Sequence, residues 1–338
     1  MKRRILILHT GGTIGMQNSP QGYVPATGFA DLVALQLQAR AVEELPAYDL
    51  VEFEQLIDSS NLNPSDWMQI GRRITEHWQD YDGFIVLHGT DTMAYTASAL
   101  SFILQGANKP VIVTGSQIPL TELRNDALDN LVTSMILAAD ERISEVCIYF
   151  NGRLLRGNRS TKVRSVGFDA FDSPNLDWLG EIGIHIQLRQ NLLLPAGQPH
   201  FELPEFSAGA VVVAPMYPGI QARVIRDLID HDDVRALIIQ SYGVGNPPDG
   251  NRALIDELAR AGEQGIVVVN ISQCLQGGVY QGAYATGSAL NQIGVVAGAD
   301  LTLEAAFTKL HHLVAMGSDA DSIRHLFAEA LCGECTVN

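Results

Sequence analysis

Short apolar runs alternate with longer amphipathic stretches through the first half of the chain. Each run is rich in β-branched residues, which predicts a strand buried in a parallel sheet. The predicted strands are 5–8, 50–57, 83–87, 109–114 and 146–150, and the predicted helices are 64–78, 93–104 and 126–139. This alternation predicts a larger N-terminal α/β domain, 1–187, built on a doubly wound, mostly parallel sheet.

The periodic pattern lapses between residues 188 and 208, where three prolines fall, and we interpret this stretch as a linker. A smaller C-terminal α/β domain, 209–338, is predicted to follow. Its predicted strands are 210–214, 236–239 and 266–269, and its predicted helices are 221–229, 252–261, 302–316 and 322–331.

Three local signals refine this outline. Asn63 followed by Pro64 predicts a helix N-cap and first turn. Asn151-Gly152 predicts a type I′ hairpin. Residues 15–28 are dense in turn formers and lack a helical period, so we expect a long loop that acts as a mobile lid. Tyr23 is the residue with useful chemistry in that loop, unless it is simply a packed surface tyrosine.

The charge balance of the chain argues against two classes of binding partner. The chain of 338 residues carries 22 basic and 38 acidic side chains, a net charge of −16. Such a surface repels phosphate backbones and anionic lipid, which argues against nucleic acid and membranes as partners. The apolar run after Lys2-Arg3-Arg4 is too short for a signal peptide, so we expect a cytoplasmic protein.

The cysteines give a weaker signal. Cys332 and Cys335 have C-x-x-C spacing, but a single such pair is weak evidence for zinc or redox chemistry. We expect them, with Cys147 and Cys274, to be thiols in a reducing compartment.

Candidate chemistry gathers where two predicted strands end. Thr10-Gly11-Gly12-Thr13 follows strand 5–8, and His88-Gly89-Thr90-Asp91-Thr92 follows strand 83–87. In open α/β sheets, ligands bind outside the carboxyl ends of the strands, so we expect one site built from both segments. Neither a dinucleotide fingerprint nor a phosphate-binding P-loop is present, which argues against nucleotide binding.

Thr13 and Thr90 are the candidate nucleophile and water activator. A hydroxyl attacks poorly unless a neighbour removes its proton or stabilises its charge. Tyr23, Asp91 and Lys162 are the candidate helpers, and each has an ordinary structural explanation when taken singly.

Asp91 and two further side chains, Ser59 and Ser60, suit the recognition of a small zwitterion. The carboxylate of Asp91 can pair with an α-ammonium group, and the hydroxyls and amides at Ser59 and Ser60 can hold an α-carboxylate. The alternatives are a helix N-cap for Asp91 and an ordinary turn for the two serines. His88 is either a base or a structural hydrogen-bonding residue.

Taken together, these motifs resemble the bacterial L-asparaginases, and most of all their cytoplasmic type I branch. The resemblance extends over both predicted domains. It rests on 10–15, 88–93, 115–117 and 161–162 in the first domain and on 217–219, 241–246 and 284–287 in the second.

The resemblance implies a hydrolase acting on a linear amide. It implies that Thr13 is the nucleophile, assisted by Tyr23, and that Thr90, Asp91 and Lys162 form a second triad. It also implies a substrate site formed by Ser59, Ser60, Thr90, Asp91 and Ser116. The implied reaction converts L-asparagine and water into L-aspartate and ammonia through a β-acyl-enzyme, with no metal or organic cofactor.

The resemblance further implies a homotetramer of two intimate dimers, in which Asn246 completes the neighbouring subunit's substrate site. The secreted relatives carry a glutamate near 277–281. This chain has no acidic residue there, which argues against activity on glutamine.

An effector site for asparagine between subunits is also implied for regulated type I enzymes. Thr161, Asn270 and Cys274 match its surroundings, but Gln240 stands where those enzymes have an arginine. Glutamine supplies no cationic fork for a carboxylate, so we predict that activation is weakened or absent.

Two other functions remain open from the sequence. One is an amidotransferase subunit that supplies ammonia for tRNA-dependent amidation, which binding to tRNA would reveal. The other is an amino-acid sensor on the same fold without catalysis, which the absence of ammonia release would reveal.

Overall fold

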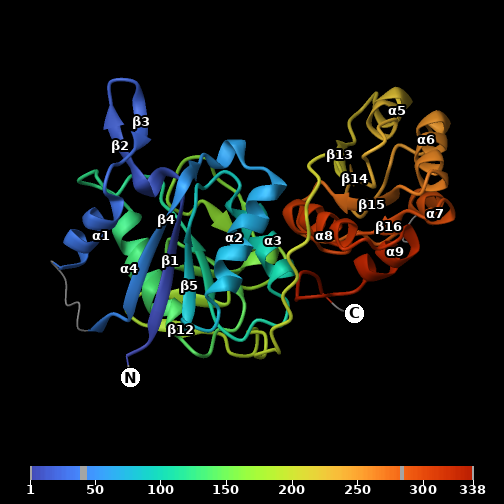
Figure 1. Ribbon diagram of the computed structural model, residues 1–338. Coiled ribbons are helices and arrows are strands. Elements are labelled where there is room, and N and C mark those ends of the chain that lie inside the picture. Colours follow the sequence, from blue (N-terminus) through green and yellow to red (C-terminus); the bar gives the residue numbers. More distant parts are fainter. Residues whose placement is uncertain (1, 39–43, 282–284, 337–338) are drawn as a thin grey trace. The chain divides into compact units, whose positions relative to one another are not determined.

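The computed structural model describes residues 2–38, 44–281 and 285–336. The chain divides into two compact units, Met1–Leu203 and Pro204–Asn338 (Figure 1). The predicted linker, 188–208, spans the division between them. Each unit contains a mainly parallel sheet with helices on both faces, which is the predicted α/β fold.

The first unit is built on an eight-stranded sheet of order β12-β11-β8-β7-β6-β5-β1-β4. The five strands from β4 to β7 run parallel, and the last three pair antiparallel. The strands are β1 Arg4–Gly11, β4 Ala47–Ile57, β5 Gly83–Leu87, β6 Val111–Thr114, β7 Val146–Phe150, β8 Arg153–Arg156, β11 Gly180–Ile182 and β12 Ile186–Leu188.

In the described part of this unit, the helices that cover the sheet are α1 Phe29–Gln38, α2 Pro64–Glu76, α3 Met93–Ile103 and α4 Ala127–Ala138. Figure 1 shows α1 and α4 on one face and α2 and α3 on the other. Alternate residues of β1 face opposite sides of the sheet, and Ile5 and Ile7 join the core under α1 and α4. Leu6 and Leu8, which face the other side of the sheet, are also fully buried. Both faces are therefore shielded from water, which explains why β5 is apolar at every position.

The predicted cap and turn of the first unit are confirmed. Asn63 is the N-cap of α2, with Pro64 in its first turn and Asp66 accepting the Asn63 N–H at 2.8 Å. Asn151 and Gly152 both have positive φ between β7 and β8, as a type I′ turn requires.

The prediction of an irregular loop at 15–28 is wrong for most of its length. Residues Met16–Ser19 (β2) and Gly22–Pro25 (β3) pair as an antiparallel hairpin, which rises beyond the carboxyl end of β1 in Figure 1. Proline and glycine at the turn end the strands but do not prevent their pairing. Helix α1, which follows the hairpin, was not predicted, although Phe29, Val33 and Leu37 are buried at helical spacing.

The second unit has a parallel sheet of order β13-β14-β15-β16. Its strands are β13 Val211–Pro215, β14 Ala236–Ser241, β15 Val267–Ser272 and β16 Val296–Ala297. Its helices are α5 Ala222–Ile229, α6 Arg252–Glu263, α7 Ala285–Gln292, α8 Leu303–Ala315 and α9 Ala320–Ala328. Two apolar clusters lie on opposite faces of the sheet, one under α5 and α6 and the other under α8 and α9.

One helix in the second unit is displaced from its predicted bounds. Helix α9 begins two residues earlier than predicted because Asp319 caps it, accepting the Ser322 N–H at 2.8 Å. Within the described residues, no helix is long and apolar enough to cross a membrane.

Candidate active site

The carboxyl ends of β1 and β5 form a topological switch point, because the chain passes from β1 to β4 on one side and then to β5 on the other. The Thr10 hydroxyl joins the two strand ends by donating to the Leu87 carbonyl at 2.8 Å. A switch point is where open α/β sheets bind ligands. The two predicted site segments therefore lie side by side.

Glycines allow these loops to approach unusually closely. Gly12 has a φ of 90°, and a Cβ built on it would lie 2.4 Å from the Gly89 nitrogen. A Cβ on Gly89 would lie 2.3 Å from the Ser59 hydroxyl oxygen. Gly115, after β6, is packed in the same way against the His88 carbonyl. The loops after β1, β4, β5 and β6 are thus in contact at the backbone.

Three of the predicted catalytic residues are joined directly. The Lys162 ammonium donates to the Thr90 hydroxyl oxygen at 2.9 Å and to Asp91 Oδ1 at 2.7 Å. Thr90 is buried and the Lys162 side chain is 20 % exposed, whereas the Asp91 side chain is 61 % exposed. The ammonium stabilises negative charge on the Thr90 oxygen. Asp91 remains open to a second partner through its other oxygen.

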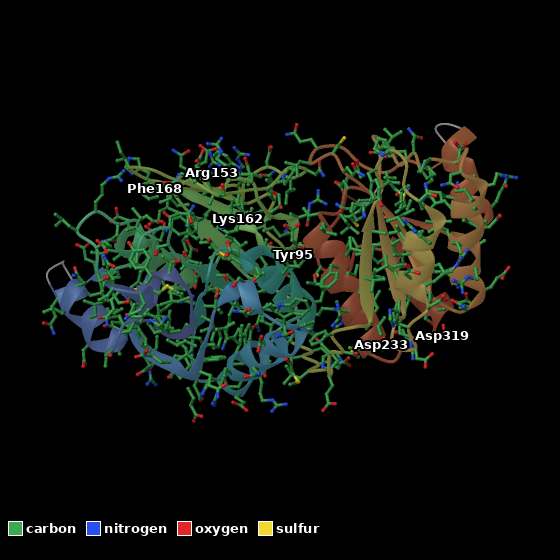
Figure 2. All side chains as sticks on the ribbon, turned by 90° about the horizontal axis from the view of Figure 1, so that it is seen from above. Tyr95, Arg153, Lys162, Phe168, Asp233 and Asp319 are labelled. Atoms are coloured by element: carbon green, nitrogen blue, oxygen red, sulfur yellow. The ribbon has the colours of Figure 1, made fainter. Side chains whose placement is uncertain are left out.

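Lys162 reaches this position from a short β-ribbon. Strand β9, Thr161–Lys162, pairs antiparallel with β10, Phe171–Asp172, and the loop between them carries Phe168. Figure 2 labels Lys162 and Phe168 and views the structure from above, where the parallel strands of the first unit end. The ribbon supplies a cation that none of the parallel strand ends carries.

The alternative role for Asp91 as a helix cap is wrong. The N-cap of α3 is Thr92, and the Thr92 hydroxyl donates to the Ser59 carbonyl at 2.8 Å. Thr92 therefore links the loops after β4 and β5, and the Asp91 carboxylate serves the ion pair with Lys162.

His88 has the structural role among its two alternatives. Its ring is 1 % exposed, and its Nδ1 lies 2.7 Å from the Gly89 carbonyl oxygen. Because a carbonyl only accepts, Nδ1 carries the proton and Nε2 accepts from the Thr96 hydroxyl at 2.9 Å. Burial lowers the pKa of His88 to about 4. The ring is therefore neutral and fully bonded, and it does not act as a base near neutral pH.

Thr13 and Tyr23 are less closely organised. Thr13 is half-buried and opens the short 3₁₀ turn Thr13–Gly15, whereas Tyr23 lies on β3 with 51 % of its surface exposed. Within the described part of the chain, no hydrogen bond joins their hydroxyls. Two hydrogen bonds tie the base of the hairpin to its surroundings: the Ala26 N–H donates to the Gly15 carbonyl at 2.8 Å, and the Thr121 hydroxyl donates to the Met16 carbonyl at 3.1 Å.

Ser59 and Ser60 lie in the 3₁₀ turn Ser59–Asn61, directly after β4. Asp58 caps this turn by accepting the Ser60 N–H at 3.0 Å. Ser59 is buried against Gly89, and Ser60 is exposed. The two serines therefore do form an ordinary turn, as the structural alternative predicts. This turn also places Ser59 against Gly89, the residue before Thr90.

Ser116 is 1 % exposed, and its hydroxyl donates to the Ile118 carbonyl at 2.7 Å. That hydroxyl is engaged within its own segment, so the backbone of Gly115 and Ser116 is the part able to line a substrate pocket. Sequence reasoning missed the polar pair Asp126 and Asn130 that holds this segment. Their spacing of four residues at the start of a helix is the signal that could have revealed them.

The remaining predicted residues lie mostly in the second unit. The Asn246 N–H donates to the Tyr242 carbonyl at 2.9 Å within a turn after β14. Asn270 is fully buried, accepting from the Ser241 hydroxyl at 2.5 Å and donating to the Gly245 carbonyl at 3.0 Å. Asn270 thus shapes the turn that carries Asn246.

The other candidate effector residues are placed as follows. Gln240 is on β14 beside that turn, and its carbonyl accepts from Gln273 Nε2 at 2.8 Å. Cys274 is exposed, while Thr161 belongs to β9 of the first unit. Tyr284, which contributes to the resemblance, lies outside the described residues. In the described ranges, no cluster of three or more histidine, cysteine, aspartate or glutamate side chains could hold a metal ion.

Comparison with known proteins agrees with a site for amide hydrolysis. The sequence matches the asparaginase N-terminal domain over residues 4–194 and the glutaminase/asparaginase C-terminal domain over residues 210–327. The chain belongs to the asparaginase family and is an amidohydrolase.

Individual relatives match along their whole length. L-asparaginase 1 of Escherichia coli K12 is 48 % identical over 335 residues, covering 99 % of this chain and 98 % of that protein. The crystal structure of L-asparaginase I from Vibrio cholerae superposes with a TM-score of 0.89 at 43 % identity, covering all of both chains. The L-asparaginase structure from Thermococcus kodakarensis gives a TM-score of 0.87 at 30 % identity, with 99 % and 100 % coverage.

Proposed function

We propose that this protein is an L-asparaginase that hydrolyses L-asparagine to L-aspartate and ammonia, with Thr13 as the nucleophile. The observation that carries the proposal is the Lys162 ammonium, which contacts both the buried Thr90 hydroxyl and the Asp91 carboxylate. A polarised hydroxyl beside an accessible carboxylate fits the hydrolysis of an amide that carries an α-ammonium group.

Substrate recognition uses the amino-acid end of asparagine. Asp91 pairs with the α-ammonium group, and its 61 % exposure leaves an oxygen accessible for this contact. Ser59 and Ser60 hold the α-carboxylate from the turn that Asp58 caps. The side-chain amide then lies between Thr13 and Thr90, next to the backbone of Gly115 and Ser116.

The reaction proceeds in two balanced steps. The Thr13 oxygen bonds to the amide carbon, the carbon–nitrogen bond breaks, and the Thr13 proton leaves with ammonia by way of Tyr23. Water then attacks the resulting β-acyl ester and the ester carbon–oxygen bond breaks. The water proton passes by way of the Thr90 hydroxyl to the departing Thr13 oxygen, while the Lys162 ammonium stabilises the negative charge that develops on Thr90. Free Thr13 and L-aspartic acid, which ionises to L-aspartate, are released. Both steps pass through an oxyanion that backbone N–H groups must stabilise.

The first experiment is the initial rate of ammonia release as a function of L-asparagine concentration. Thr13→Ala and Thr90→Ala are compared with the parent and with Thr75→Ala. Thr75 is a matched control because its hydroxyl donates to Arg72 near the end of α2, away from the strand ends. We expect loss of activity in the first two variants only. Ammonia release by the Thr13→Ala variant would overturn the assignment of Thr13 as the nucleophile. The absence of ammonia release by the parent protein would overturn the proposed function.

The shape of the same curve tests regulation. We propose that activation by asparagine is weakened or absent, because Gln240, among the candidate effector residues Thr161, Asn270 and Cys274, supplies no cation for a second carboxylate. A hyperbolic curve is expected. A sigmoidal curve with a Hill coefficient well above one would contradict this.

We also propose a cytoplasmic homotetramer in which Asn246 completes the neighbouring subunit's site. Co-expressed Thr13→Ala and Asn246→Ala subunits test this, because a mixed pair would retain one intact site. With random pairing, about a quarter of the parental activity should return. No recovery from mixed pairs would show that each chain supplies its own Asn246.

A further inference from the structure

The segment after β6, residues 115–121, touches both halves of the candidate site. Gln117 Nε2 donates to the Gly167 carbonyl at 2.8 Å, in the loop that follows Lys162. The Leu120 N–H donates to the Ile14 carbonyl at 3.2 Å, next to Thr13. The position of this segment therefore affects the Lys162 ribbon and the Thr13 turn together.

Asp126 fixes the middle of that segment. Its carboxylate accepts the Gln117 N–H at 2.9 Å and 3.1 Å and the Ile118 N–H at 3.0 Å. An aspartate at a helix N-cap ordinarily accepts from its own helix. Asp126 is the N-cap of α4 but makes no such cap bond. Its carboxylate holds the 115–121 segment instead.

Asn130, one turn further along α4, fixes the beginning of the segment. Its Nδ2 donates to the Gly115 carbonyl at 3.0 Å and to Asp126 Oδ2 at 3.3 Å. Its Oδ1 accepts the Asn151 N–H at 3.3 Å, and the side chain is 3 % exposed. The Asp126–Asn130 pair thus fixes Gly115, Gln117 and Ile118 by hydrogen bonds.

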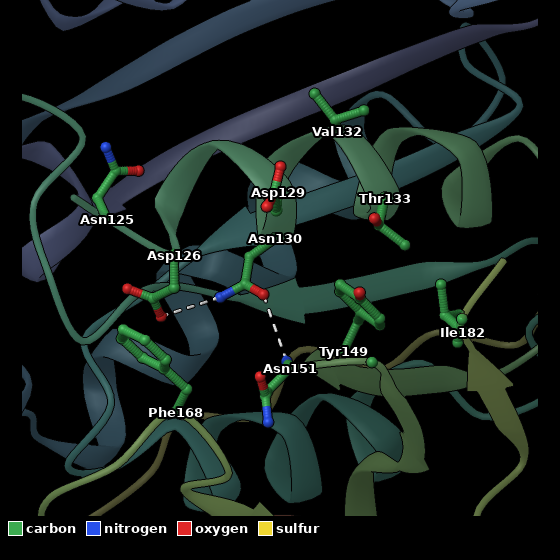
Figure 3. Close-up of a pocket in the computed structure, with 12 residues that line it drawn as sticks. Asn125, Asp126, Asp129, Asn130, Val132, Thr133, Tyr149, Asn151, Phe168 and Ile182 are labelled. Atoms are coloured by element: carbon green, nitrogen blue, oxygen red, sulfur yellow. Dashed lines mark hydrogen bonds between the residues drawn. The ribbon is translucent and has the colours of Figure 1, made fainter. Parts of the chain in front are cut away.

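The pair borders an open pocket. Asp126 and Asn130 line a pocket of about 530 Å³, together with Asp129, Asn151 and Phe168 (Figure 3). Figure 3 shows the chain of hydrogen bonds from Asp126 through Asn130 to Asn151 at the edge of this space.

Gly115 packs against the His88 carbonyl and Leu120 lies in the apolar core, so the two ends of the segment are held by packing. Between them, Gln117 and Ile118 are only half-buried, and the hydrogen bonds to Asp126 hold them.

We propose that Asp126, supported by Asn130, is a positioning residue for amide hydrolysis that holds the Gly115–Ser116 backbone in register with Thr13 and Thr90. The inference rests on the proposed asparaginase function. Asp126 acts through the segment and does not touch the substrate. Small displacements of positioning groups have large effects on the chemical step, so the effect should fall on kcat.

Asp126→Asn is the main test, with Asp129→Asn as its control. An asparagine keeps the shape but turns one accepting oxygen into a donor facing backbone N–H groups. Asp129→Asn removes the same charge from the same pocket. We expect kcat for L-asparagine to fall about tenfold or more in Asp126→Asn, with KM changed less than about threefold. Asp129→Asn should stay within about twofold of the parent.

Two further variants separate positioning from folding. Asn130→Asp replaces the donor to the Gly115 carbonyl with an acceptor and should lower kcat in the same direction. Asp126→Glu keeps a carboxylate and should recover part of the loss. The inhibition constant for L-aspartate, which reports the amino-acid end of the site, should change less than about threefold in all of them.

Amide hydrogen exchange gives a readout that does not depend on activity. Exchange at Gln117 and Ile118 should speed up at least about tenfold in Asp126→Asn and not in Asp129→Asn. Unchanged exchange, a kcat within twofold of the parent, or an equal loss in Asp129→Asn would overturn the positioning role. If the parent protein releases no ammonia while hydrogen exchange responds as expected, the proposed asparaginase function is overturned. Asp126 would then hold the 115–121 segment without a catalytic role.

Discussion

The two predicted catalytic groups differ in how completely the structure organises them. Thr90, Asp91 and Lys162 are joined at 2.7–2.9 Å, and Thr90 is buried. Thr13 and Tyr23 are not joined, and Tyr23 is carried on a hairpin with half of its surface exposed. We propose that Thr90, Asp91 and Lys162, which are already in contact, form a rigid group that activates water. We propose that Thr13 and Tyr23 form a mobile group that activates the nucleophile when the hairpin closes.

The largest effect should come from removing the cation of the rigid group. In Lys162→Met the Thr90 oxygen and the Asp91 carboxylate lose their shared partner. We expect kcat to fall about 10³-fold, equivalent to about 4 kcal/mol. The steady-state rate of ammonia release measures this loss of kcat. The thermal unfolding temperature of the variant shows whether it is still folded. A loss below tenfold would mean that Lys162 is a surface charge with no catalytic role.

The next effect concerns His88, the neutral histidine two residues before Thr90. The pKa of His88 is lowered from 6.5 to about 4 by burial, so the unfolded chain binds a proton first as the pH falls. Its contribution to stability is complete above pH 6.5 and is lost as the pH falls towards 4, by up to ~3 kcal/mol. His88→Gln should remove that part of the pH dependence.

Urea unfolding at pH 7 and pH 4.5 measures this loss. The protein has three tryptophans, Trp67, Trp78 and Trp178, and all lie in the first unit, so their fluorescence reports that unit. This matters because burial also lowers the pKa of His311, in the second unit, to about 4. Equal pH dependence in the parent and His88→Gln would contradict the neutral, bonded ring.

A smaller effect is expected in the mobile group. Tyr23→Phe removes the hydroxyl but leaves the exposed hairpin packing, so kcat should fall about 10²-fold with little change in thermal stability. The dependence of kcat on solvent viscosity sharpens the comparison. If closure of the hairpin limits the rate, kcat should fall as viscosity rises, whereas the pre-formed contacts of Lys162 should not respond to viscosity. A loss of stability larger than the loss of activity would make Tyr23 a structural residue.

The smallest effect tests the turn that presents the serines. Asp58→Ala removes the acceptor for the Ser60 N–H, and N-cap losses cost about 1 kcal/mol. We expect KM for L-asparagine to rise about fivefold with kcat nearly unchanged. Asp58→Asn, which still accepts, is the matched control. A change in kcat alone, with KM unchanged, would show that Ser59 and Ser60 do not contribute to binding of the substrate before the reaction.

Local signals predicted the fold well where burial and capping are strong. The run Gly83–Leu87 was predicted with its observed bounds because all five residues are buried and flanking residues end the strand. The hairpin at 16–25 was missed because its strands are exposed and carry no apolar alternation. Antiparallel pairing between the two strands, rather than burial, stabilises it.

The site was predictable as residue types and only partly as contacts. Glycine and threonine at two strand ends indicated where chemistry should gather, but the Lys162 contact spans 72 positions and no local pattern specifies it. The N-cap of α3 is Thr92 rather than Asp91, and the Asp91 carboxylate pairs with Lys162, a contact that the local sequence does not specify. The roles of Asp126 and Asn130 depend on where α4 lies against the 115–121 segment, which only the folded chain reveals.

The separation between Thr90 and Lys162 also has a consequence for biosynthesis. The strand that ends at Leu87 is made well before the β9–β10 ribbon, and the ribbon itself closes only once Phe171 and Asp172 exist. A growing chain on the ribosome therefore carries Thr13 and Thr90 without the cation that polarises the second hydroxyl. On the proposed mechanism, the chain therefore has no activity until at least residue 172 of 338 has been made, about halfway through synthesis. If Asn246 completes the neighbouring subunit's site, activity begins only after whole chains have assembled.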